Sequence, residues 1–157
     1  MNAYGAALVQ QWSGKIPQDS QMMLTQRLEK LDDDKVAAVG IVALKNPVVG
    51  LVLGLFFGGL GVDRFYKGDI GLGLLKLFGL MFIWILVFMF GGAAIMLGAA
   101  AGDDDGAAVG AAFGILLSFG AWLITIVWCI LDLFFVWKGI KKDNLNKINN
   151  QLMMCGA

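Results

Sequence analysis

The sequence has no histidine, which removes the commonest general base and the commonest metal ligand of proteins. Without an imidazole, neither a Ser-His-Asp triad nor a Cys-His pair can be assembled. Cysteine is also scarce. Cys129 lies inside an apolar run and Cys155 lies near the end of the sequence, so we expect no disulfide framework. No acids or thiols converge at catalytic or metal-ligand spacing, and we therefore expect a non-enzymatic protein with no cofactor and no metal.

Charge is the second shortage. Only 15% of the 157 residues are charged, and 12 Lys and Arg balance 12 Asp and Glu. A soluble domain usually has about 25% charged residues. Because there is no basic excess to neutralise phosphates, nucleic acid is not an expected partner. Most of the rest is apolar, with 59% hydrophobic residues and 22 glycines, so we expect an integral membrane protein whose main partner is the lipid bilayer.

The three longest runs without a charge are residues 47–62, 77–102 and 106–131. The last two are the longest and are equal in length. A helix of that length covers about 39 Å, against a hydrocarbon core of about 30 Å, so both are predicted to span the membrane. The first run covers only about 24 Å. It spans if residues 36–44 extend it or if the bilayer is thinned, and otherwise it re-enters.

A Gly-Asp-Asp-Asp-Gly segment, residues 102–106, separates the two long runs and predicts a tight turn in water. The runs should therefore form an antiparallel hairpin. Glycines at four-residue spacing predict close helix packing, within one chain in preference to a homodimer seam. These glycines are Gly50, Gly54 and Gly58 in the first run and Gly106, Gly110 and Gly114 in the last.

Two charges lie at matching distances from this turn. Lys76 precedes Gly102 by as many positions as Asp132 follows Gly106. In a straight hairpin they reach the same depth, at the interface opposite the turn. We hypothesise a Lys76–Asp132 pair there. Arg64 is a competing partner for Asp132, and in a third possibility each charge simply reaches the lipid headgroups.

The ends of the chain show helical spacing of leucine and isoleucine. Leu24, Leu28 and Leu31 lie in residues 20–31, and Leu145, Ile148 and Leu152 lie near the C-terminus. Either helix could lie on the membrane or pack on a partner. The favoured interpretation of both is a solvated helix with one weakly buried stripe.

Orientation follows from the basic residues. Four lysines follow the last apolar run and none lies in the acidic turn, which predicts a cytoplasmic C-terminus and an external turn, typically in a bacterial inner membrane. The N-terminus is external if the first run spans. If that run re-enters, all twelve basic residues lie inside.

The predicted organisation is an N-terminal segment (1–44), a transmembrane domain (45–140) and a polar tail (141–157). The fold class is an all-α membrane bundle with a long hairpin and amphipathic terminal helices.

The most specific local pattern is Gly-Gly-Leu-Gly-Val-Asp-Arg-Phe-Tyr-Lys-Gly, residues 58–68. Its glycines end an apolar helix, and an adjacent acid and base precede two aromatic rings, which suits an anchored turn at the interface. Asp63 and Arg64 could also form a local ion pair that helix movement makes or breaks, although a static anchor is the preferred interpretation. The candidate motif residues are Asp63, Arg64, Phe65, Tyr66, Gly68, Lys76, Trp128 and Asp132.

Several motifs in order resemble the TM2 (two-transmembrane) domain family. They are Lys-Asn-Pro at 45–47, the 58–68 pattern, Gly-Leu-Gly at 71–73 and Trp-Cys-Ile-Leu-Asp at 128–132. Family members usually pass from the region of Lys76 and Leu77 to the Trp-x-x-x-Asp motif in roughly ten residues, so this chain resembles a member with an insertion of about forty residues within 79–127. The resemblance implies a non-enzymatic membrane protein with a structural, assembly or signalling role. The glycine faces would let it assemble as a homo-oligomer or with another membrane protein.

The alternative function is a pore or membrane-active toxin, suggested by the alanine- and glycine-rich hairpin. A channel needs polar side chains that face a lumen. Only Ser118 and Thr125 are available in the last run, which favours a dry bundle.

Overall fold

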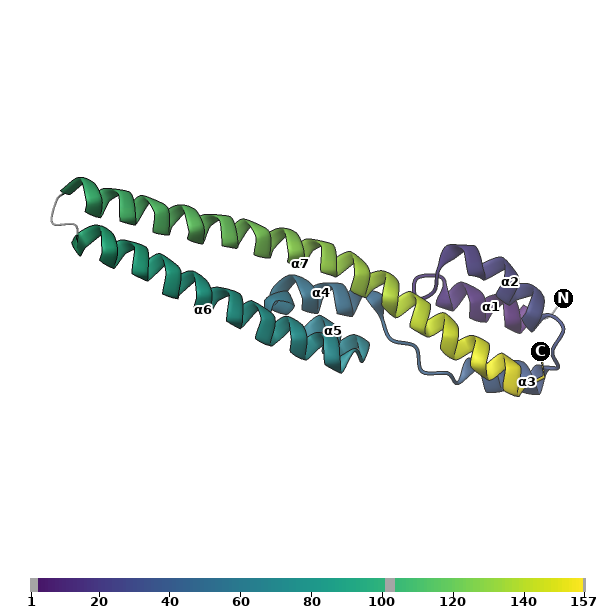
Figure 1. Ribbon diagram of the computed structural model, residues 1–157. Coiled ribbons are helices and arrows are strands. Elements are labelled where there is room, and N and C mark those ends of the chain that lie inside the picture. Colours follow the sequence, from purple (N-terminus) through teal and green to yellow (C-terminus); the bar gives the residue numbers. More distant parts are fainter. Residues whose placement is uncertain (1–2, 101–103, 157) are drawn as a thin grey trace. The chain divides into compact units, whose positions relative to one another are not determined.

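The computed structural model describes residues 3–100 and 104–156, and the regular elements among them are all helices (Figure 1). The predicted all-α class is confirmed. The chain divides into two compact units. Met1–Val52 and Phe134–Ala157 form the terminal unit, and Leu53–Leu133 form the hairpin unit.

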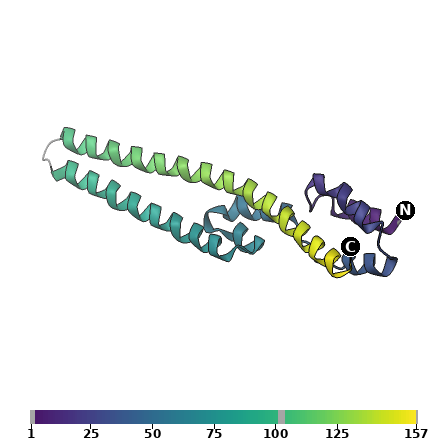
Figure 2. The ribbon, with the colours of Figure 1, turned by 45° about the vertical axis from the view of Figure 1, so that its right-hand side comes forward.

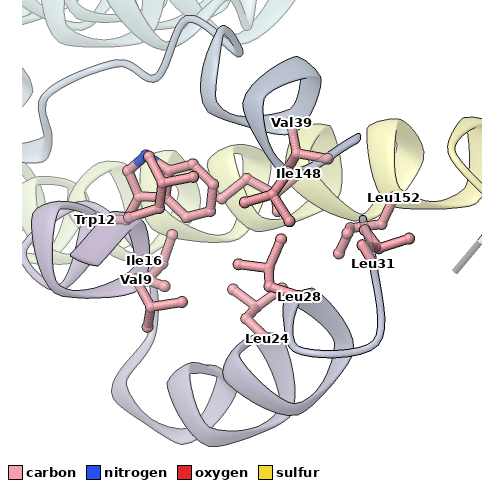
Figure 3. Packing of buried hydrophobic residues seen from close by; sticks show 11 residues of the cluster. Val9, Trp12, Ile16, Leu24, Leu28, Leu31, Val39, Ile148 and Leu152 are labelled. Carbon is pink, nitrogen blue, oxygen red and sulfur yellow. The ribbon is translucent and has the colours of Figure 1, made fainter. Parts of the chain in front are cut away.

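The terminal unit joins the two ends of the chain. It contains α1 (Ala3–Trp12), the 3-10 turn η1 (Gln18–Ser20), α2 (Gln21–Leu28), α3 (Asp33–Gly40) and the C-terminal part of α7 (Asp104–Met154). Apolar side chains from all four α-helices meet in one core (Figure 3). This core contains Leu8, Val9, Trp12, Ile16, Leu24, Leu28, Leu31, Val36, Val39, Ile148 and Leu152.

The burial of this core corrects the expectation of two solvated, weakly buried helices. Leu24, Leu28, Ile148 and Leu152 are all 0% exposed. The reason is that the apolar stripe of α2 and that of the end of α7 contribute to the same core, which α1 and α3 complete. Neither stripe is left for a membrane surface.

Asn144 fixes the segment that leads out of this core. Its side chain is 1% exposed. Its Oδ1 accepts the backbone N–H of Lys45 at 3.0 Å, and its Nδ2 donates to the carbonyls of Lys15 and Lys45 at 2.9 and 2.7 Å. One buried amide therefore holds two loop segments against α7.

The first apolar run, residues 47–62, leads from the core of the terminal unit into the hairpin unit. Residues before this run and residues after the hairpin contribute side chains to the same core. The run forms α4 (Pro47–Phe57) and the 3-10 turn η2 (Gly58–Leu60). The 11 residues of α4 cover only about 16 Å. This length is short of a hydrocarbon core of about 30 Å, which favours the re-entrant alternative, and re-entry stays a prediction.

The hairpin unit is built on two long helices, α6 (Ile70–Ala100) and the first part of α7 (Figure 2). Within the described residues these are the helices long and apolar enough to cross a membrane. The predicted turn at 102–106 falls partly on residues 101–103, which lie outside the described residues. The remaining residues of the predicted turn, 104–106, are helical, since α7 begins at Asp104. Aspartates suit the first turn of a helix, where the backbone dipole is positive.

Glycine packing holds the two long helices together near this end. A Cβ on Gly98 would overlap the carbonyl oxygen of Gly106, and one on Gly110 would overlap that of Ala94. Gly114 lies similarly close, with its hypothetical Cβ 3.3 Å from the carbonyl oxygen of Gly91. The glycines of the last run therefore serve packing within one chain.

The glycines of the first run behave differently from one another. A Cβ on Gly54 would overlap the side chain of Leu133 and lie 3.3 Å from Cβ of Asp63. Gly50 is buried. Gly58 makes no such approach, because a Cβ there would meet nothing within 4 Å. The reason is that α4 ends at Phe57, so Gly58 belongs to the following turn.

Candidate functional site: a buried ion network

A short helix, α5 (Val62–Lys67), positions the network. Gly61 and Gly68 flank it with φ of 71° and 108°, in the left-handed region that favours glycine. A Cβ on Gly61 would lie 2.7 Å from the carbonyl oxygen of Gly73, and a Cβ on Gly73 would lie 2.7 Å from the ring of Phe65. These glycines let α5 lie directly against α6.

Lys76 is the centre of the network. Its Nζ donates to both carboxylate oxygens of Asp63, at 3.1 and 3.3 Å, and to Asp132 at 2.5 Å. Asp63 is 0% exposed, Asp132 6% and Lys76 8%. One ammonium group on α6 therefore joins a carboxylate on α5 to another on α7.

Arg64 extends the network toward the surface. Its Nε and one terminal nitrogen donate to the two oxygens of Asp132, and the other terminal nitrogen donates to Asp69 at 3.4 Å. Asp69 also accepts the Nζ of Lys67 at 2.5 Å. The whole set has three acids and three bases, so it is neutral.

The two outer charged groups have shifted pKa values. The hydrogen bond to Asp132 raises the pKa of Arg64 above its ordinary value. The hydrogen bond from Lys67, with the positive charges nearby, lowers the pKa of Asp69. Both shifts favour the charged forms at neutral pH.

The geometry combines two partners that the sequence had presented as alternatives. Asp132 pairs with Lys76, as equal depth suggested, and also with Arg64. The adjacent Asp63 and Arg64 each pair with residues elsewhere instead of with one another: Asp63 with Lys76, and Arg64 with Asp132 and Asp69.

Sequence reasoning assigned no part to Lys67 or Asp69. Lys67 lies within the 58–68 pattern and Asp69 directly follows it, both within five positions of Arg64, and this nearness was the available signal. Of the other candidate residues, Phe65 packs on Gly73, Gly68 ends α5 and Tyr66 is half-buried. Trp128 lies one turn before Asp132 and is 59% exposed.

The network has the composition of a structural site. Lys76 supplies the positive charge between Asp63 and Asp132, where a bound cation would otherwise be needed. No group of three or more His, Cys, Asp or Glu in residues 3–100 and 104–156 could hold a metal ion.

Its position along the hairpin is near one end of the apolar surface. On α7, Asp132 follows the charge-free run 106–131, and Lys138 is the next charged residue. The interval between them corresponds to about 9 Å of helix. Charges cost less near the ends of a membrane span than at its centre, and these charges are also paired.

The comparison with known families matches this region. Residues 43–95 match the family model of the TM2 domain. The chain carries a TM2 domain. The matched residues include Asp63, Arg64 and Lys76, whereas Asp132 lies beyond them on α7. The fourth member of the central ion pairs thus comes from outside the matched part of the TM2 domain.

A curated relative supports the same assignment. It is an uncharacterised membrane protein, YozV, of Bacillus subtilis (strain 168), and it is 43% identical over 44 residues. The aligned part is 28% of this chain, which spans about half (52%) of the relative's length. No solved structure matches. This chain is a membrane protein with a TM2 domain.

Proposed function

We propose that the protein is a non-enzymatic scaffold that tethers a small helical domain to the cytoplasmic side of a membrane. The observation that supports this most is the pairing of the buried charges. Asp63, Lys76 and Asp132 are each used in ion pairs between helices. A catalytic acid, base or nucleophile needs a proton or an electron pair directed at a substrate, and these groups are directed at one another.

The distribution of basic residues supports the cytoplasmic placement. The terminal unit contains nine of the 12 Lys and Arg. They are Lys15, Arg27, Lys30, Lys35, Lys45, Lys138, Lys141, Lys142 and Lys147. Basic residues close to membrane spans are retained on the cytoplasmic side, which favours a cytoplasmic terminal unit.

The hydroxyl groups of the hairpin argue against a pore. Ser118 donates to the carbonyl of Gly114 at 2.9 Å, and Thr125 donates to that of Ala121 at 2.8 Å. Each hydroxyl therefore hydrogen-bonds to its own helix. A water-filled lumen would need these groups to hydrogen-bond with water or ions.

A labelling experiment tests the orientation. Single cysteines replace Asp105 and Asn150, both exposed, in a background where Cys129 and Cys155 are changed to alanine and serine. A membrane-impermeant maleimide added to intact cells should label Asp105→Cys and should label Asn150→Cys only after permeabilisation. The opposite pattern overturns the cytoplasmic scaffold.

Dye release from liposomes tests the dry bundle. Vesicles that contain the purified protein should retain a trapped fluorescent dye as well as protein-free vesicles do. Leakage that rises with the protein-to-lipid ratio overturns the scaffold in favour of a pore.

A further inference from the structure

A groove of about 520 Å³ lies beside the ion network, between α6 and α7. Ligand pockets in proteins usually have about 300–1,000 Å³. Most of its lining is apolar, including Gly79 and Trp128. Arg64, Lys76 and Asp132 line it as well: Asp132 is the last lining residue on α7, and Lys76 lies one helical turn inside Leu72, the first lining residue on α6. The groove is therefore amphipathic, with one charged end.

The length of the groove matches one leaflet of a bilayer. On α7 its lining runs from Asp132 to Ala121, which is about 16 Å of helix. Half of a hydrocarbon core is about 15 Å. Because Asp132 lies near one end of the apolar surface, the groove begins near the membrane edge and extends toward the middle of the bilayer.

The charged end retains hydrogen-bond donors. A guanidinium group has five N–H donors. The bonds of Arg64 to Asp132 and Asp69 use three of them, which leaves one on each terminal nitrogen. Lys76, by contrast, directs its ammonium at Asp63 and Asp132. Arg64 is thus the residue at this end that can donate hydrogen bonds to a further acceptor, and the planar guanidinium suits a phosphate.

We infer that the groove binds a phospholipid from the leaflet whose edge lies at the Asp132 end of the groove. One acyl chain lies between α6 and α7, and the phosphate accepts the two remaining N–H groups of Arg64. The lining itself supports a lipid occupant, since it includes large apolar side chains that the described part of the chain leaves uncovered. Leu72 is 49% exposed and Leu75 68%, and both line the groove.

A glycine in the wall allows a direct test. A Cβ on Gly79 meets nothing within 4 Å, so Gly79→Leu fills the groove without displacing the backbone. Gly120 on α7 is equally open but is not part of this lining, so Gly120→Leu is the matched control. Native mass spectrometry then counts dipalmitoyl phosphatidylglycerol bound to the purified protein in detergent.

The wild type and Gly120→Leu should bind one lipid with the same Kd. Gly79→Leu should bind it at least about tenfold more weakly, because the exclusion of two methylene groups already has that effect. Equal binding by Gly79→Leu and the wild type overturns the proposal. A change in oligomer size without a change in lipid binding also overturns it, and then indicates that a second copy occupies the groove.

The contact between Arg64 and the phosphate is tested by comparing two lipids that differ in the phosphate-containing headgroup. The wild type should bind phosphatidylglycerol about tenfold more tightly than dipalmitoylglycerol, which has the same chains and no phosphate. Arg64→Gln should lose this preference. If that variant does not fold, the wild-type comparison still decides, and equal binding of the two lipids overturns the role of Arg64.

Discussion

Removal of the positive charge at Lys76 should destabilise the hairpin through Asp63. Asp63 is 0% exposed, and its two ion-pair contacts both come from Lys76. Lys76→Met leaves this carboxylate buried and unpaired, whereas Asp132 keeps Arg64. A broken buried pair costs about 3–5 kcal/mol. We expect a loss of that size in the free energy of unfolding in detergent, measured by circular dichroism.

A second substitution identifies the cause. Asp63→Asn has nearly the same shape and removes the orphaned charge, so Asp63→Asn with Lys76→Met should be more stable than Lys76→Met alone. The coupling energy of the double-mutant cycle should be about 1–3 kcal/mol. Lys138→Met, at an exposed position, should change little. If the two losses simply add, Lys76 does not act through Asp63 and the reasoning is refuted.

Three further predictions concern other parts of the molecule. Asn144→Leu removes three partly buried hydrogen bonds and should cost about 2–4 kcal/mol, seen as faster proteolysis of residues 41–46; a rate equal to that of the wild type contradicts the role of Asn144. Gly98→Leu should lower the unfolding midpoint strongly and Gly120→Leu should not, because a Cβ at Gly98 overlaps backbone and one at Gly120 meets nothing; equal midpoints argue against tight helix packing there. Asp69 has a lowered pKa, so its stabilising contribution is complete above its ordinary pKa of about 3.9 and is lost as the pH falls through the lower folded value. The stability difference between the wild type and Asp69→Asn should therefore be constant from about pH 7 to about pH 5 and shrink below about pH 4, and a difference that grows on acidification disproves this assignment.

The hairpin could be predicted from the sequence because the absence of charge throughout 77–102 and again throughout 106–131 is a strong local signal. The Lys76–Asp132 pair could be predicted for a related reason: depth along two straight helices is fixed by counting residues. The bond from Lys76 to Asp63 could not, since it depends on the left-handed turn at Gly61 and on the approach of α5 to Gly73.

The packing of the terminal unit could not be predicted from local sequence patterns, for a different reason. The helices α1, α2 and α3 have only 10, 8 and 8 residues, and such short helices are stable mainly through tertiary packing. Their partner, the end of α7, is more than a hundred residues away from α2 in the sequence. The helical spacing of apolar residues showed that Leu24 and Ile148 lie on apolar stripes. It did not show that the two stripes pack in the same core.

The central claim is that the first apolar run re-enters and that the two ends of the chain share one core. The most direct measurement is the sidedness of both ends in one membrane preparation, with single cysteines at the exposed positions Gln10 and Asn150. In sealed vesicles of either orientation, an impermeant maleimide should label both variants to the same extent, before and after permeabilisation. Protection of one end where the other is labelled means that α4 crosses the bilayer, and it contradicts the account.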